Sequence, residues 1–228
     1  LLEGWTMDKI AEVLETKLGL NKKGVLTLCK NRSFVNKTGI PSKSLEGFLF
    51  PDTYFFHEDD SPENVLTQIT EEYQKNISDD LRTRADEMGF SELEMITLAS
   101  IIEGEAIYDT ERSIISAVYH NRLKLGMKLQ ADPTIQYIIK GSPRRLLNRD
   151  LKINSPYNTY LYDGLPPGPV NNPGKASILA ALYPDENDYL FFVARGDGYH
   201  TFSKTKEEHN RAKKIFQKVR RKYRKKRR

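Results

Sequence analysis

The sequence predicts an α+β fold in which a small α/β module precedes a mainly helical domain with a small β-region. Apolar residues recur at helical spacing in several stretches that begin with capping residues and end at glycine. Two aromatic-rich runs, 45–56 and 189–203, are instead typical of strands. With 228 residues, of which 38% are hydrophobic, the chain is long enough to bury a substantial core.

The first quarter of the chain is predicted to form the small module. One helical pattern ends near Gly19, and a second short helix is expected at about 25–36. In the run 45–56, LEGFLFPDTYFF, aromatic residues dominate and Pro51 interrupts, which is typical of strand segments with an edge or a bulge at the proline. Aromatic runs are commonly core, but the interleaved Glu46 leaves room for one wall of a cleft.

The middle of the chain is predicted to be helical, with helices at about 62–76 and 79–88. Ser91 and Glu94 then have the spacing of a capping box, and apolar residues recur behind them at helical spacing. Glu103 therefore lies at the end of an apolar helix.

Glu103 is the first candidate for a catalytic group. Its neighbours Ile101 and Ile102 are apolar, so burial of this turn would remove water from the carboxylate. Loss of hydration favours the protonated form, which suits a general acid. The alternative is a solvated glutamate on the polar face of the last turn, because glutamate is rarely fully buried.

A further helix is expected to begin at Asp109 or Thr110 and to end before Gly126. Residues 129–134 then break the helical pattern with polar groups that can hydrogen-bond a ligand.

The proline-, glycine- and asparagine-rich segment 155–174 is longer than a simple turn, and long loops inside compact domains are usually functional or disordered. Its tyrosines favour an ordered loop. A helix at about 175–183 follows, and residues 189–194 and 199–203 are predicted to pair as a hairpin that brings His200 to a sheet edge or face.

The charge of the chain is unevenly distributed. The formal net charge is +5, but residues 211–228 contain 12 Lys or Arg and no acid. Without them, 24 basic residues face 31 acidic ones, so the body carries about −7 and is not a polyanion binder on charge grounds. The basic tail can bind anionic lipid or nucleic acid, or be a solvated terminal helix. No apolar run reaches the about 18 residues that cross a bilayer.

Several chemistries are excluded by the residues present. Cys29 is the single cysteine, so the chain has no internal disulfide and no thiolate metal cluster, and it has no glycine-rich phosphate loop or G-x-S-x-G motif. The histidines are not spaced to pair with the acids at 105–111, so we expect no metal and no cofactor. Carboxylate chemistry remains, in a site rich in Tyr, Asn, Gln and Pro, which is a composition typical of carbohydrate sites. Classical glycosidases use two carboxylates, whereas one well-placed glutamate is recognisable here.

Five stretches together resemble the MltG (YceG-like) family of endolytic murein transglycosylases. They are LEGFLFPDTYFF (45–56), LASIIEGEA (98–106), ERSIISAVYHNRLKLGMKLQADPTIQY (111–137), SPYNTYLYDGLPPGPVNNPG (155–174) and YLFFVARGDGYHTFSKTKEEHN (189–210). The opening EGWTMDKIAEVL (3–14) is similar to the LysM-like module of that family. The predicted organisation is a LysM-like module with its connecting strand at 1–56, a YceG-like catalytic domain at 57–210 and a basic tail at 211–228.

The resemblance implies a reaction that needs one carboxylate. Lytic transglycosylases cleave the β-1,4 bond from N-acetylmuramic acid to N-acetylglucosamine without water, leaving a 1,6-anhydro end. The catalytic glutamate of the family falls on Glu103, which would act as general acid and then as general base. The family often has a polar or basic residue after that glutamate, where this chain has Gly104. The residues expected to bind substrate are Glu46, Gln130, Asp132, Tyr157, Asn158 and His200.

The family setting implies glycan strands of peptidoglycan as substrate and peptidoglycan synthases as partners. It also implies the outer face of the bacterial cytoplasmic membrane, reached through an N-terminal anchor that this chain lacks. One alternative is a non-catalytic glycan-binding or scaffold protein of the cell wall. Another is nucleic-acid binding through 211–228, although a body at about −7 argues against specific readout.

Overall fold

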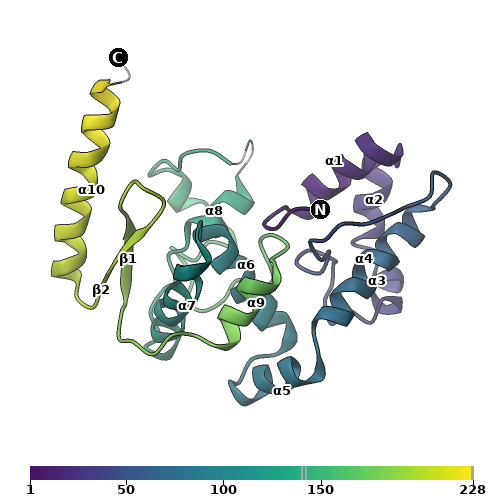
Figure 1. Cartoon of the computed structure of the whole chain (residues 1–228), viewed down its shortest axis with the longest axis horizontal. Helices are drawn as coiled ribbons and strands as arrows, with labels where there is room; N and C mark the ends of the chain where they lie inside the picture. Colours follow the sequence, from purple (N-terminus) through teal and green to yellow (C-terminus); the bar gives the residue numbers. More distant parts are fainter. Residues whose placement is uncertain (140, 142, 227–228) are drawn as a thin grey trace.

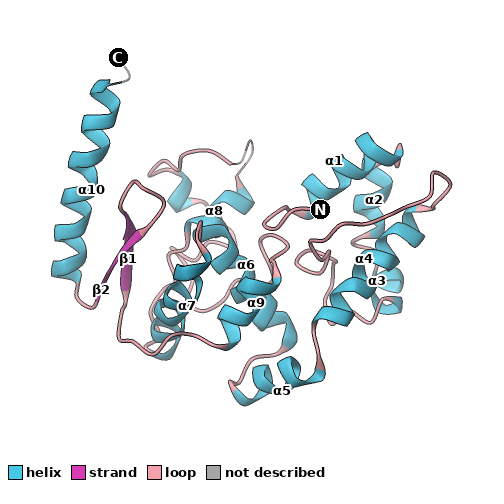
Figure 2. Ribbon diagram, in the orientation of Figure 1, coloured by secondary structure: helices cyan, strands magenta, loops and turns pink. Residues whose placement is uncertain are grey.

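The computed structural model describes residues 1–139, 141 and 143–226 and shows a mainly helical protein with one two-stranded sheet (Figures 1 and 2). The elements of the first half are α1 (Met7–Leu18), α2 (Lys22–Leu28), α3 (Arg32–Lys37), α4 (Pro62–Asn76) and α5 (Asp79–Glu87). Those of the second half are α6 (Glu92–Glu105), α7 (Asp109–Lys124), α8 (Asp132–Ile138), a 3₁₀ turn (Asp150–Lys152), α9 (Lys175–Leu182), β1 (Phe191–Ala194), β2 (His200–Ser203) and α10 (Lys206–Lys226). The predicted α+β class is confirmed.

Helix α6 lies at the centre of the molecule (Figure 1). It begins at the predicted capping box, in which the Ser91 hydroxyl accepts from the Glu94 backbone N–H and the Glu94 carboxylate accepts from the Ser91 backbone N–H. Every residue from Met95 to Ile102 is buried, so this helix has no solvent-facing side along that stretch. It packs against α9 most extensively, and also against α7 and α8. Glu103 therefore emerges from a core helix.

The N-terminal helices share this core. Ile10 of α1, Val25 of α2 and Val35 of α3 belong to the same cluster of buried apolar residues as those of α4 and α6. The segment before α1 is tied to the loop before α9, because Gly4 N–H donates to the Asn172 carbonyl and Asn172 N–H donates to the Trp5 carbonyl, each over 2.9 Å. The division of the chain at residue 56 stays a prediction.

The prediction of strand segments at 45–56 is wrong. These residues are irregular, and within the described part of 1–56 the regular elements are helices alone. Leu45, Phe48 and Leu49 are fully buried, so the apolar run serves the core rather than a β-ladder. Gly47 has φ +90°, and a Cβ there would lie 2.3 Å from Pro169, so the chain turns where a strand would continue.

Two helix predictions need correction. The expected helix at 25–36 is two helices, α2 and α3, because Asn21 and Asn31 each cap a separate start. The break in the helical pattern that was expected at 129–134 ends earlier, because α8 already begins at Asp132. Pro133 lies in the first turn of α8, where proline is tolerated because a backbone N–H at that position would have no partner within the helix. The helices predicted at 62–76, 79–88 and 175–183 are confirmed, with boundaries within a few residues. The helix that follows the capping box at Ser91 and the one expected to begin at Asp109 or Thr110 and to end before Gly126 are confirmed as well.

The predicted hairpin is also confirmed. Strands β1 and β2 pair antiparallel, with Phe191 opposite Ser203 and Ala194 opposite His200. Helix α10 packs on this hairpin and includes most of the basic tail, while residues 227–228 lie outside the described part. Figure 1 shows α10 at one end of the molecule, opposite the N-terminal helices. Among the described residues, no helix combines the length and the apolarity needed to cross a membrane.

Candidate active site

The side chain of Glu103 is enclosed at the meeting point of three helices. It lies in the last turn of α6 and is only 7% exposed. Its Oε2 accepts hydrogen bonds from Arg112 Nη1 of α7 at 3.1 Å, from Ser177 Oγ of α9 at 2.8 Å and from the backbone N–H of Gly174 at 3.1 Å. Oε1 receives no hydrogen bond from the described residues. The structure therefore contradicts the alternative of a solvated Glu103 side chain.

Arg112 organises the charges around Glu103. Its guanidinium is 8% exposed and contacts Asp109 through Nε at 2.9 Å, Ser177 through Nη1, and Glu103. The arginine comes from the first turn of α7, which begins at Asp109 directly after the short loop from α6. The helix-loop-helix connection thus brings a cation to the end of the helix that carries Glu103.

A second carboxylate, that of Glu3, lies beside this group. Its Oε2 is 4.0 Å from Arg112 Nη2, and its carboxyl group packs on Gly174, where a Cβ would lie only 1.8 Å from Oε1. Partial burial raises the pKa of Glu3, and the neighbouring charge of Glu103 raises it further. Glu3 is half exposed, whereas Glu103 is covered.

A further polar cluster borders the end of α6. Glu105 accepts hydrogen bonds through Oε1 from the Tyr119 hydroxyl and from the Asp132 backbone N–H, both at 3.2 Å. Burial raises the pKa of Glu105 to about 7, and the charge of Asp132 acts in the same direction. Tyr160 donates its hydroxyl hydrogen to Asp132. At Gly104 a Cβ would lie 2.6 Å from Pro133, so the residue between Glu103 and Glu105 must be small for α6 and α8 to meet.

The family model described as the YceG-like family matches residues 1–215. The chain belongs to the YceG-like family.

Curated relatives agree with this assignment. An endolytic murein transglycosylase of Bacillus subtilis (strain 168) is 38% identical over 231 residues, which cover 94% of this chain and 63% of the relative. An endolytic murein transglycosylase of Streptococcus pneumoniae serotype 2 (strain D39 / NCTC 7466) is 29% identical over 236 residues, covering 92% of this chain and 42% of the relative. The chain thus spans about two fifths to three fifths of the length of these relatives. The crystal structure of a yceG-like protein from Listeria monocytogenes matches with a TM-score of 0.85 at 37% identity, covering 92% of this chain and 74% of that one.

Of the residues predicted to bind substrate, Asp132 lies at the end of α6, and Gln130 precedes it by two residues. Both are exposed, and the Asp132 backbone N–H contacts Glu105. Gln130 has φ +48°, the only positive φ of a non-glycine residue in the described chain. Such a conformation is uncommon outside glycine, and it occurs often at functional positions.

Two other predicted residues are buried and engaged within the protein. The carboxylate of Glu46 accepts from the Met7 backbone N–H at 2.9 Å and from Asn172 Nδ2 at 3.3 Å, and burial raises its pKa to about 7. Asn158 donates to the carbonyls of Leu151 and Ile153. These contacts hold the loops that surround the site.

The last two predicted residues, His200 and Tyr157, are partly buried, and each contacts another side chain. His200 pairs its Nδ1 with Glu111 Oε2 at 2.8 Å, and its backbone N–H donates to Oε1 of the same glutamate. Tyr157 packs its ring on that of Tyr137, with 5.0 Å between the ring centroids. A role for either residue in binding substrate stays a prediction.

The sequence reasoning missed Arg112, Ser177, Gly174 and Glu3 as neighbours of Glu103. It also missed Asn171, whose Nδ2 donates to the Ser100 carbonyl at 2.9 Å while its buried Oδ1 has no partner in the described structure. These residues are distant from Glu103 along the chain or carry no distinctive motif. The described residues contain no group of three or more His, Cys, Asp or Glu that could hold a metal ion.

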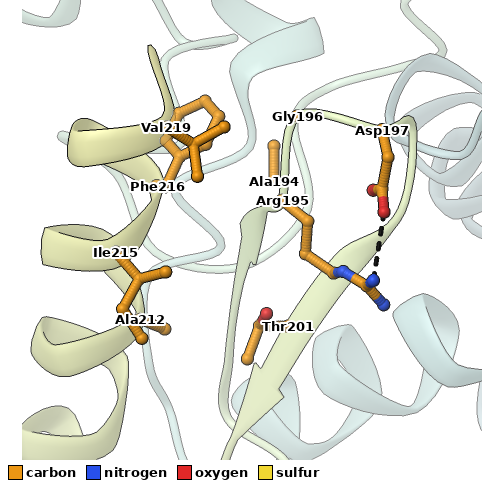
Figure 3. Close-up of a pocket in the computed structure, with 9 residues that line it drawn as sticks. All are labelled: Ala194, Arg195, Gly196, Asp197, Thr201, Ala212, Ile215, Phe216 and Val219. Carbon is orange, nitrogen blue, oxygen red and sulfur yellow. Dashed lines mark ion pairs between the residues drawn. The ribbon is translucent and has the colours of Figure 1, made fainter. Parts of the chain in front are cut away.

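A groove of about 380 Å³ lies between the hairpin and α10 (Figure 3). Small residues of the sheet, Ala194 and Thr201, face Ile215, Phe216 and Val219 of α10 across it. Its lining includes neither Glu103 nor any group in contact with it, so it has no part in the chemistry considered below.

Proposed function

We propose that this chain is the catalytic part of an endolytic peptidoglycan lytic transglycosylase in which Glu103 is the single acid–base group. The observation that carries the proposal is the environment of the carboxylate: one oxygen is fixed by three donors from α7, α9 and the loop before α9, and the other receives no hydrogen bond from the described residues. The printed names of the relatives, endolytic murein transglycosylase, support the same reaction.

The proposed reaction has two proton transfers at the same carboxyl group. Protonated Glu103 first donates its proton to the glycosidic oxygen as the bond from that oxygen to muramyl C1 breaks, and the electron pair stays with the departing N-acetylglucosamine. The Glu103 carboxylate then takes the proton of the muramyl C6 hydroxyl while the C6 oxygen bonds to C1. Water is not consumed, and Glu103 ends in the protonated form in which it began.

The surroundings of Glu103 suit this double role. Because Arg112, Ser177 and Gly174 all contact Oε2, Oε1 is the oxygen available to exchange a proton with substrate. Between the two transfers the sugar ring carries positive charge, as in glycosidases generally. A preorganised carboxylate close to that charge stabilises it without reorganisation.

We propose that Gln130 and Asp132 contact the sugars next to the cleaved bond, because they are exposed at the start of α8, beside the end of α6. We propose that Tyr157 and His200 line the substrate site farther from the cleaved bond. For Glu46 and Asn158 we propose positioning roles, since their polar atoms already contact the protein.

The setting of the proposed activity is the extracytoplasmic side of a bacterial cell envelope. The substrate would be the glycan strands of peptidoglycan, and peptidoglycan synthases are proposed partners. Attachment to the cytoplasmic membrane through an N-terminal anchor is part of the same proposal.

Mass spectrometry of uncrosslinked glycan strands digested by the chain tests the proposal. The wild type should release 1,6-anhydro-muramyl ends, and Glu103→Gln, which preserves shape and removes the titrating group, should release none. Glu105→Gln, two residues further on the same helix, is the matched control and should still form the anhydro product. Reducing ends would indicate a hydrolase, and loss of activity in Glu105→Gln alone would assign the acid to Glu105. Glycan binding that survives Glu103→Ala, without product at any enzyme concentration, would favour the non-catalytic alternative.

A further inference from the structure

The segment before α1 forms part of the candidate site. The hydrogen bonds from Gly4 N–H to the Asn172 carbonyl and from Asn172 N–H to the Trp5 carbonyl hold this segment against the loop before α9. Gly4 has φ +74°, and a Cβ there would lie 3.7 Å from Glu103 Cγ, so the backbone at residue 4 passes directly over the catalytic side chain. The position of Glu3 is therefore set by backbone contacts on its C-terminal side.

The carboxyl group of Glu3 occupies the space that a side chain at residue 174 would need. A Cβ on Gly174 would lie 1.8 Å from Glu3 Oε1 and 2.2 Å from its carboxyl carbon. The backbone N–H of this same glycine donates to Glu103 Oε2. Glu3 and Glu103 thus contact the same residue, one at its Cα and one at its N–H.

Arg112 is shared by three carboxylates. Its guanidinium lies 3.1 Å from Glu103, 2.9 Å from Asp109 and 4.0 Å from Glu3. When all three acids are ionised, this group carries a net charge of −2 around one cation. Such an excess of negative charge in a partly buried place favours uptake of a proton by the group and favours a cation placed next to it.

We infer that Glu3 is a positioning residue of the proposed reaction: through Arg112 it keeps the charge around Glu103 negative, which favours the proton that the first step needs and the positive charge on the sugar ring that follows. The inference rests on the proposed function and adds a second carboxylate to it, supplied by the segment before α1. Without Glu3, the guanidinium is shared by fewer acids, so the attraction of Arg112 for the Glu103 carboxylate is less opposed. The group as a whole then takes up a proton less readily at neutral pH.

The pH dependence of kcat for release of anhydro ends by the 228-residue chain tests this inference. Glu3→Gln keeps the size of the side chain and removes its charge. It should lower kcat at neutral pH about tenfold with little change in KM, and it should move the alkaline limb of the profile to lower pH. Glu3→Asp, which retains a carboxylate, should recover part of the activity. Glu12→Gln is the control, since Glu12 pairs with Lys9 on the exposed face of α1 and should behave as wild type.

A second variant, Gly174→Ala, retains every charge of the group and displaces the carboxylate of Glu3. In Gly174→Ala the new Cβ must displace the carboxyl group of Glu3, while the backbone at this position, with φ −77°, accepts alanine without strain. Its alkaline limb should shift in the same direction as that of Glu3→Gln. Wild-type kcat and pH profiles in both variants, with Glu103→Gln inactive, would overturn the role of Glu3 and leave the proposed function standing. Absence of anhydro ends from the wild type at every pH would overturn both.

Discussion

The hydroxyl of Ser177 donates to Oε2 of Glu103 over 2.8 Å, although 74 residues separate the two in sequence. Ser177 is fully buried in the first turn of α9, where Arg112 Nη1 also donates to its Oγ. The hydroxyl therefore connects the cation and the carboxylate of the candidate site. The extensive packing of α9 on α6 holds this arrangement in place.

Replacing Ser177 with alanine should lower kcat by about 10- to 100-fold, because a hydrogen bond to a charged group contributes about 1.5–3 kcal/mol. The carboxylate keeps its contacts with Arg112 and Gly174, so activity should fall without disappearing. Steady-state release of anhydro ends measures the effect. Ser116→Ala is a matched control, since Ser116 is also fully buried but its Oγ has no partner in the described structure. Equal kcat in the two variants would show that the Ser177 contact is unimportant for turnover.

The backbone at Gln130 gives a second prediction. With φ +48° this residue is in the left-handed region, which costs a non-glycine residue about 1–2 kcal/mol relative to glycine. Gln130→Gly should therefore raise or preserve the melting temperature while lowering activity on glycan, because it removes a side chain proposed to contact the sugar. Gln130→Ala should lower activity equally and keep the strained backbone. Full activity in both variants would exclude Gln130 as a substrate contact.

Local patterns in the sequence were sufficient to predict most of the helices and the hairpin. The capping box at Ser91 and Glu94 and the turn at 195–198 are signals contained in a few residues, and the structure has both elements where they were expected. The prediction of strands at 45–56 was wrong because an aromatic-rich run is compatible both with a strand and with a buried irregular segment. At Asp132-Pro133 the same two residues signal a turn or the first turn of a helix, and packing against α6 selects the helix.

The site was less predictable than the fold. Glu103 could be predicted as a candidate from its helix and from the family resemblance, but its neighbours in space could not. Gly174 and Ser177 lie 71 and 74 residues away, and they reach Glu103 only because α9 packs on α6. Glu3 reaches the site from the other end of the chain. Nothing in a single sequence indicates such contacts, because they depend on the tertiary arrangement of elements that each look ordinary.

Glu46 predicts how stability depends on pH. Burial raises its pKa from 4.5 to about 7 in the folded protein, so folding is favoured while the side chain is protonated. This contribution is fully present below pH 4.5 and is lost as the pH rises to about 7. Glu46→Gln stays neutral and should lose less stability over that range, by up to ~3 kcal/mol. Urea unfolding at pH 4.5 and pH 8 measures the difference.

One control variant and one further residue bear on that measurement. Glu12→Gln, on the exposed face of α1, should unfold with the same pH dependence as the wild type. Glu105, whose pKa is also raised to about 7, should account for part of the pH dependence that remains in Glu46→Gln. Identical slopes of stability against pH in Glu46→Gln and the wild type would contradict the assignment.

His209 controls the attachment of α10 in the final prediction. Its ring is largely buried and stacks on Phe191 of β1 with 5.2 Å between ring centroids, and burial lowers its pKa from 6.5 to about 4, with Lys213 and Lys206 acting in the same direction. A histidine whose pKa is depressed on folding stabilises the folded arrangement above its unfolded pKa, and this contribution is lost as the pH falls from about 6.5 toward 4. Protection of α10 amides from hydrogen exchange, corrected for intrinsic rates, should therefore decline in that range while α6 stays protected.

His209→Phe keeps an aromatic ring against Phe191 and removes the titration, so its α10 should stay protected. His57→Phe, at an exposed loop position, should retain the wild-type decline. Protection of α10 that is independent of pH in the wild type would exclude His209 as the cause and would leave the packing of α10 on the hairpin to its apolar residues alone.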